Sequence, residues 1–137
     1  MSEPVDLASL RREYRTRPLR RADLAADPIV QFQRWFTEVL NANVLDPNAM
    51  SVATVGDDGQ PSLRMVLLKY FDATGFVFYT NLESRKAREM AGNTRVALLF
   101  YWAEISRQVR ITGTATRISA AESLRYFLTR PRDSQIG

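Results

Sequence analysis

Two cations stand at the start of a short predicted helix, where a helix ordinarily favours anions. Ser84 is a good N-cap residue, and Arg85 and Lys86 follow it in the first turn. Each cation there costs about 0.3–1 kcal/mol, because the helix dipole is positive at this end. A bound phosphate would reverse that cost, since backbone N–H groups and both side chains would face one anion. The pattern predicts a phosphate site, and the alternative is that both side chains extend into water.

Two further cations, Arg64 and Lys69, interrupt the first of two apolar strands that precede this helix. Apolar runs at 65–68 and 76–79 flank a turn signal at 72–75, which predicts a hairpin. Alternation places side chains five residues apart on opposite faces of a strand. One ligand could therefore contact both cations only at a bulge or at the strand's end. The alternative is two unrelated charges on an exposed strand.

A second candidate anion site lies further along the chain. Tyr126 and Arg130 are four residues apart, which places them on one face of a helix. Pro131 ends that helix, so Ser134 would approach from the following turn. A phenol, a guanidinium and a hydroxyl could together bind a small anion. An ordinary amphipathic helix end explains the same spacing.

The composition excludes several kinds of chemistry within these 137 residues. The sequence has no Cys and no His, so it cannot supply a disulfide, a thiolate nucleophile, a His general base or a Cys- or His-ligated zinc. It also has no P-loop, no glycine-rich dinucleotide fingerprint and no cluster of metal ligands. We therefore predict no metal site and no nucleotide in a doubly wound sheet.

The charge balance leaves two kinds of anionic partner open. Net charge is +4, with 17 Arg against 2 Lys. Arg suits bidentate contacts to phosphate or carboxylate, and a basic RNA-binding protein is the rival interpretation. The longest apolar run, residues 96–103, is far shorter than the ~18 residues of a membrane span, and the first ten residues do not resemble a signal peptide. We expect a soluble, cytoplasmic protein that binds no membrane and, with RNA binding as the rival, no nucleic acid.

Periodicity predicts a set of short strands between two helices. Asp27-Pro28 begins the first helix, which should end near Asn43. Ser119 and Glu122 form a capping box for the last helix. Between them we predict strands at 50–55, 65–68, 76–79, 96–102 and 107–117, a turn at 56–59, and a short helix from Ser84 to about Ala91. The strand at 96–102 should be buried, because its apolar run is unbroken.

Tight turns between short strands make the sheet antiparallel, and a chain of this size is best closed as a small barrel. We predict one domain over residues 27–137. Residues 1–26 are expected to form a flexible basic arm, with six Arg between positions 11 and 21 and a short helix at 5–14. A solvated tail without a role is the alternative.

Several segments, in this order, resemble the pyridoxine/pyridoxamine 5′-phosphate oxidase family. They are RREYRTRPLRRADLAADPI, PSLRMVLLKYFDATGFVFYTNLESRKA, NTRVALLFYW, RQVRITGTATR and YFLTRPRDSQIG. The motifs R-x-V-L-L-K, F-Y-T-N-x-x-S-R-K and R-P-R-D-S-Q-I-G are highly specific. The resemblance implies a mainly β fold with flanking helices, an antiparallel FMN-binding split β-barrel. It also implies a homodimer with FMN at the interface.

The resemblance also implies roles for particular residues. FMN-binding positions would be Arg64, Met65, Val66, Leu67, Leu68, Lys69, Tyr79, Thr80, Arg85, Lys86 and, from the partner subunit, Gln108. Substrate-binding positions would be Arg11, Tyr14, Lys69, Tyr126, Arg130 and Ser134. No residue is assigned as catalytic.

The implied reaction is the oxidation of pyridoxamine or pyridoxine 5′-phosphate to pyridoxal 5′-phosphate, with oxygen as acceptor. The flavin carries the redox chemistry, which suits a chain without His or Cys. Members of the family continue beyond the SQIG segment, so we expect a chain truncated within the domain. The alternatives are a split-barrel flavoprotein with another substrate, such as a phenazine-pathway relative, or a non-catalytic flavin or B6-phosphate carrier.

Overall fold

A computed structural model describes residues 3–10 and 18–128 of the chain, and the side chains up to residue 125. The first helix, α1, spans Pro28–Asn41 and begins as predicted. The Asp27 carboxylate accepts a hydrogen bond from the backbone N–H of Ile29 at 2.8 Å, and Pro28 is the first helical residue. The helix ends two residues before the predicted Asn43, which has a positive φ of 54°.

The predicted strands and the short helix between them are confirmed, with some changes of length. The strands are β1 (Ala49–Val55), β2 (Pro61–Asp72), β3 (Gly75–Phe78), β4 (Arg95–Trp102) and β5 (Arg107–Thr114). The other helices are α2 (Arg85–Gly92) and α3 (Ala120–Leu128), and two single 3₁₀ turns span Arg21–Asp23 and Ala103–Ile105. The turn predicted at 56–59 joins β1 to β2, and Gly59 supplies its positive φ of 81°.

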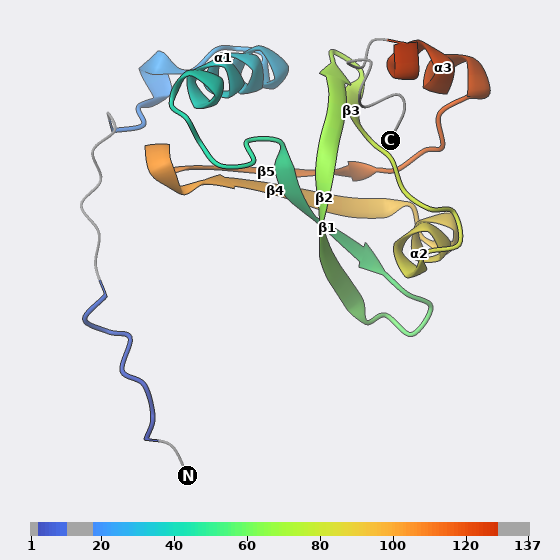
Figure 1. The fold of residues 1–137 in the computed structure, drawn as a ribbon, viewed down its shortest axis with the longest axis horizontal. Coiled ribbons are helices and arrows are strands. Elements are labelled where there is room, and N and C mark those ends of the chain that lie inside the picture. Colours follow the sequence, from blue (N-terminus) through green and yellow to red (C-terminus); the bar gives the residue numbers. More distant parts are fainter. Residues whose placement is uncertain (1–2, 11–17, 129–137) are drawn as a thin grey trace.

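The sheet has the order β3-β2-β1-β4-β5, and every neighbouring pair is antiparallel. Figure 1 shows β2 crossing the direction of β4 and β5 steeply, so the sheet is strongly curled. Among the described residues β3 and β5 are the two edges, and they do not pair with each other. The predicted antiparallel β fold with flanking helices is confirmed, and this part of the chain forms a half-barrel.

One aromatic side chain of α1 holds the core together. The ring of Phe32 is 3% exposed and lies in the hollow of the sheet. Its centroid lies between 4.9 and 5.9 Å from the centroids of five other rings, those of Phe36, Phe71, Phe76, Phe100 and Trp102. These rings come from α1, β2, β3 and β4, so Phe32 joins the helix to three strands of the sheet.

Strand β4 is buried on one face only, which corrects the prediction of a fully buried strand. Leu98, Phe100 and Trp102 point into the core, whereas Tyr101 is 65% exposed. An unbroken apolar run does not by itself imply burial on both faces, because an antiparallel sheet covered by helices on one face leaves its other face open. Apolar residues therefore lie on an uncovered face as well.

That uncovered face, here called the outer face, consists of Leu63, Met65 and Leu67 of β2 with Leu99 and Tyr101 of β4. Met65 is 63% exposed. Met65 and Leu99 flank the same residue of β1, Ser51, so apolar side chains from β2 and β4 lie on the same side of the sheet. An exposed apolar area with side chains from two strands is typical of a surface that binds another protein.

The helix predicted at 5–14 does not form in its described part. Residues 5–10 contain only a turn, closed by the hydrogen bond from the N–H of Leu10 to the carbonyl of Leu7. All eight residues from 3 to 10 are exposed, so an isolated helix of this length has no packing to stabilise it. Residues 11–14 lie outside the described part of the chain.

Replacing Phe32 with Ala should lower the free energy of unfolding by about 3–5 kcal/mol, because the cavity would lie among five rings. Val30→Ala is the matched control, since Val30 lies on the same helix and is 39% exposed. Its effect should stay within about 0.5 kcal/mol. Urea unfolding followed by circular dichroism measures both, and equal losses would contradict the central role of Phe32.

Candidate cofactor site

The start of α2 is capped as the sequence predicts. The hydroxyl of Ser84 accepts a hydrogen bond from the N–H of Ala87 at 3.2 Å, so the predicted N-cap is confirmed. The hydroxyl of Thr80 lies 3.3 Å from the Ser84 hydroxyl. The N–H groups of Arg85 and Lys86 come before the first residue that can donate within the helix. They are therefore geometrically available to a ligand at this end.

Arg85 does not simply extend into water. Its Nε donates a hydrogen bond to Oε1 of Glu89 at 2.8 Å, one turn further along α2. The Arg85 side chain is 69% exposed, whereas that of Glu89 is 9% exposed. The guanidinium therefore has one fixed end in the protein and its terminal amino groups near the solvent.

Glu89 is anchored from the sheet as well as from its own helix. Its Oε2 accepts a hydrogen bond from the hydroxyl of Thr54 at 2.8 Å, and its Oε1 accepts one from the hydroxyl of Ser62 at 3.0 Å. The hydrogen bond from Thr54 is the main reason why the pKa of Glu89 lies below its usual value. Those from Arg85 and Ser62 lower the pKa further, while burial acts in the opposite direction.

Arg64 belongs to the same cluster. Its Nη1 donates to the hydroxyl of Thr54 at 2.7 Å and to the carbonyl of Val52 at 3.1 Å. Thr54 is fully buried, so its hydroxyl relays between a guanidinium and a carboxylate away from water. Thr54, Ser62, Arg64, Arg85 and Glu89 are called the Glu89 cluster below. Two of the predicted cofactor cations are thus joined through two residues, Thr54 and Glu89, that the sequence analysis missed.

The four-residue spacing of Arg85 and Glu89 is the one sequence pattern that could have predicted part of this cluster. Residues four apart on a helix face each other, and an Arg–Glu pair at that distance is a common ion pair. Nothing in the local sequence indicates that Thr54 lies opposite Glu89, because the two are 35 residues apart and meet only when α2 packs on β1.

Arg64 and Lys69 lie on opposite faces of β2, as predicted. The strand also has the bulge that, in the prediction, would let one ligand contact both cations. Arg64 and the buried Leu68 lie on the core side of β2, and Lys69 is exposed. The pairing of β2 with β3 shifts register between Leu68 and Tyr70, so Lys69 lies at a bulge. Asn48 fixes this point, since its Nδ2 donates to the Leu68 carbonyl at 3.0 Å.

The rest of the predicted FMN-binding stretch divides between the two faces of β2. Met65 and Leu67 lie on the outer face, whereas Val66 and Leu68 pack into the core. The side chains of Val66 and Leu68 therefore belong to the core and do not extend from the sheet. Tyr79 and Thr80 directly follow β3 and lead to the start of α2. The stretch from β3 to α2 thus brings Thr80, Arg85 and Lys86 to one place.

Gln108 lies apart from this cluster in the chain. It is exposed on β5 and pairs with Tyr101 of β4. Because β1 and β4 separate β5 from β2, strands β2 and β5 are about 14 Å apart along the sheet. Gln108 therefore does not join Arg64 and Arg85 within one subunit.

The predicted substrate positions lie mostly outside the described residues. Four of them are not described, namely Arg11, Tyr14, Arg130 and Ser134. Tyr126 lies in α3, but its side chain is not described. The start of α3 is confirmed, because the Ser119 hydroxyl accepts from the N–H of Glu122 at 3.1 Å. The roles of these positions stay predictions.

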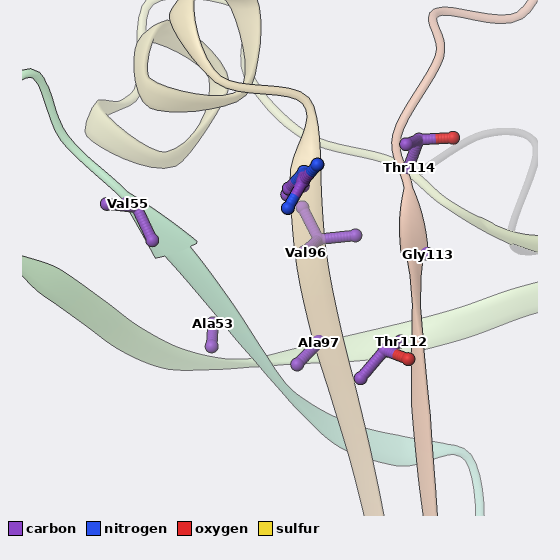
Figure 2. A pocket seen from close by; sticks show the side chains of 8 residues that line it. Ala53, Val55, Val96, Ala97, Thr112, Gly113 and Thr114 are labelled. Atoms are coloured by element: carbon purple, nitrogen blue, oxygen red, sulfur yellow. The ribbon is translucent and has the colours of Figure 1, made fainter. Parts of the chain in front are cut away.

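A hollow of about 480 Å³ lies over small residues at one end of the sheet, and Figure 2 shows it between β1, β4 and β5. Ala53, Ala97 and Thr112 are in register across these strands and line it. None of the predicted site residues does. Within the described ranges no three acidic side chains are placed to hold a metal ion, and no helix is both long and apolar enough to cross a membrane.

Residues 36–137 match the family described as Pyridoxamine 5′-phosphate oxidase. The chain belongs to that family. Two relatives in the pyridoxamine 5′-phosphate oxidase family, both named pyridoxine/pyridoxamine 5′-phosphate oxidase, illustrate the likeness. The protein from Rippkaea orientalis is 56% identical over 133 residues, which cover 97% of this chain and 63% of the relative. The one from Rubrobacter xylanophilus is 59% identical over 132 residues, covering 96% and 61%. The chain thus spans less than two thirds of the length of these relatives.

Solved structures agree with the family's fold. The chain resembles PhzG from Burkholderia lata, solved in complex with tetrahydrophenazine-1-carboxylic acid, with a TM-score of 0.77 and 30% identity. That likeness covers 85% of this chain and 58% of PhzG. An FMN-binding protein of Nostoc punctiforme, described as related to pyridoxamine 5′-phosphate oxidase, gives a TM-score of 0.57 at 19% identity and supports the fold alone.

The lowered pKa of Glu89 predicts an acid-dependent loss of stability. A carboxylate whose pKa is lowered by folding stabilises the folded state above the ordinary glutamate pKa of about 4.3, and that contribution is lost as pH falls through the folded pKa. Glu89→Gln lacks this contribution. The difference in unfolding free energy between the native chain and Glu89→Gln should therefore be largest above about pH 5 and shrink below it.

Urea unfolding at several pH values measures this difference. Asp72, whose pKa is lowered mainly by the hydrogen bond from the Thr74 hydroxyl, titrates in the same direction but is present in both proteins and cancels. A difference that stays constant between pH 6 and the acid limit of folding would contradict the assignment to Glu89.

Proposed function

We propose that the chain is part of an FMN-dependent oxidase that converts pyridoxamine or pyridoxine 5′-phosphate to pyridoxal 5′-phosphate, with oxygen as acceptor. The observation that carries the proposal is the Glu89 cluster, which joins Arg64 of β2 to Arg85 at the start of α2. Family membership supplies the reaction class. The named relatives, longer than this chain, support the substrate.

The donor set at α2 fits a phosphate group of FMN. Arg85 and Lys86 bring two cations to a helix start whose first N–H groups point along the helix axis. Thr80 and Ser84 add hydroxyls on the same side. Arg64 lies deeper and fixes the strand behind the site through Val52 and Thr54. When bound, FMN supplies the redox chemistry, taking up a hydride equivalent from the substrate C4′ and returning electrons to oxygen.

The protein's own part in this reaction is to bind and orient. Lys69 lies at the bulge of β2, on the exposed side, where a cation can meet a second phosphate. In the proposal it acts with Tyr126, Arg130 and Ser134 on the substrate phosphate, and Arg11 and Tyr14 close over the substrate. A phosphorylated cofactor beside a phosphorylated substrate accounts for two separate groups of cations in one small domain.

The proposal includes a homodimer with FMN at the interface. The outer face offers the apolar surface, with Leu63, Met65 and Tyr101 all more than half exposed. Gln108 borders that surface, since it pairs with Tyr101 at the far side of the sheet from Arg64. In the proposal, Gln108 of the partner subunit reaches the flavin of the first. A cytoplasmic location belongs to the same proposal, because phosphorylated metabolites do not cross membranes freely.

A second candidate is an oxidase of a phosphate-free ring system, favoured by the likeness to PhzG. It would use the same flavin site and differ in the substrate positions. A non-catalytic flavin carrier would have the same flavin site but would turn over no substrate. The three candidate functions therefore predict the same FMN binding, and they differ in which substrate, if any, is oxidised.

Turnover of a phosphorylated substrate tests the proposal. The chain saturated with FMN should oxidise pyridoxamine 5′-phosphate and release hydrogen peroxide, both of which can be followed by absorbance. Pyridoxamine without its phosphate should react at least about tenfold more slowly, since a charged hydrogen bond contributes about 1.5–3 kcal/mol. Turnover of tetrahydrophenazine-1-carboxylic acid alone would favour the second candidate. No turnover of either compound with FMN bound would contradict an oxidase activity of this chain.

The outer face makes a separate prediction about assembly. Met65→Lys should shift the chain towards monomer in analytical ultracentrifugation, because a buried lysine at an apolar interface is costly. Leu45→Lys is the control, since Leu45 is 83% exposed and lies outside the outer face. A monomeric native chain in the presence of FMN, or equal behaviour of the two variants, would rule out this surface as the dimer interface.

A further inference from the structure

We infer that Glu89 is a positioning residue for cofactor binding, which holds the Arg85 guanidinium ready for a phosphate before the ligand arrives. This inference rests on the proposed function, because it assumes that the anion at α2 is the phosphate of FMN. It concerns a residue to which neither the family motifs quoted above nor the predicted site residues give a role.

In this ion pair the Glu89 carboxylate is fixed by the sheet, whereas the Arg85 guanidinium is exposed. Glu89 is held by two hydroxyls of the sheet, those of Thr54 at 2.8 Å and Ser62 at 3.0 Å. Arg85 has one contact in the described structure, its Nε on Glu89. The carboxylate cannot easily move, so the long Arg85 side chain is fixed relative to β1 and β2 rather than only to its own helix.

The remaining donors of Arg85 suit a phosphate. A guanidinium has five N–H donors, and the contact with Glu89 uses the one on Nε. The two terminal amino groups stay available and can bind two phosphate oxygens side by side. Because the side chain is already ordered, less conformational entropy is lost when the phosphate binds.

A purely electrostatic role for Glu89 and a positioning role predict opposite changes in FMN affinity when Glu89 is removed. A carboxylate near an anion site repels the anion, so its removal would strengthen binding. Ordering of Arg85 predicts that removal weakens binding. The sign of the change in affinity therefore distinguishes the two roles.

Arg64 provides a second distinction. Its Nη1 also donates to the Val52 carbonyl, which is independent of Glu89. Loss of Glu89 should leave Arg64 in place and affect the anion site through Arg85 alone. The effect of removing Glu89 should then disappear in a chain that already lacks the Arg85 side chain.

The test is a flavin titration followed by fluorescence quenching, with FMN and the phosphate-free riboflavin as paired probes. Glu89→Ala should raise the Kd for FMN about 3- to 10-fold and leave the Kd for riboflavin unchanged. Glu89→Gln, which keeps one acceptor oxygen for Arg85, should give a smaller increase. Glu83→Gln is the matched control: it removes an exposed carboxylate near the same helix start without touching Arg85, so it should not raise either Kd.

A double-mutant cycle completes the test. In an Arg85→Ala background, Glu89→Ala should change the Kd for FMN less than twofold. Thermal melting of each variant checks folding. If Glu89→Ala does not fold, Ser62→Ala replaces it, because it removes one of the two sheet hydroxyls that hold the carboxylate and should still raise the Kd for FMN.

The possible results distinguish a failure of the positioning role of Glu89 from a failure of the proposed phosphate site. Tighter or unchanged FMN binding by a folded Glu89→Ala or Ser62→Ala chain would overturn the positioning role while leaving the proposed function intact. Equal weakening for FMN and riboflavin would show a general structural role and would also overturn it. A native chain that binds FMN no better than riboflavin would overturn the proposed phosphate site, and the inference with it.

Discussion

The alternation of side chains along β2 is the constraint on which the rest of the structure depends. Every second residue from Ser62 to Leu68 faces inward, so one strand supplies part of the Glu89 cluster and part of the core. The residues between them form most of the outer face. A one-residue slip would exchange the two sets and put Arg64 into solvent and Met65 into the core. The bulge at Lys69 then changes the phase, which lets Phe71 rejoin the core against Phe32.

The Glu89 cluster resolves an electrostatic problem created by the sequence. Two cations at a helix start and a third on a neighbouring strand would repel one another without a counter-charge. Glu89 supplies that charge from inside the helix, at a point where buried Thr54 can share it with Arg64. The cluster leaves net positive charge at the surface of the site and keeps the buried polar atoms hydrogen-bonded.

The sequence predicted the elements well because the signals for them are local. The Asp27 and Ser84 caps, the glycine turn and the apolar periodicity each act within a few residues and are all found in the structure. The features it did not predict depend on distant pairing. Glu89 meets Thr54 only through the docking of α2, and the exposure of Tyr101 depends on which face the core occupies. The site at Arg130 and Ser134 lies outside the described residues and stays a prediction.

The position of β1 in the sheet has a consequence for how the chain folds. Strands β1, β2 and β3 follow one another through short turns, and so do β4 and β5, so each group can form from neighbouring residues. The contact between the groups is different, because Ser51 pairs with Leu99, 48 residues further along. Closing a loop of that length carries the larger entropic cost and delays the joining of the two groups. We expect the exposed edges of β1 and β4 to be the part of a newly made chain that most needs protection from wrong partners.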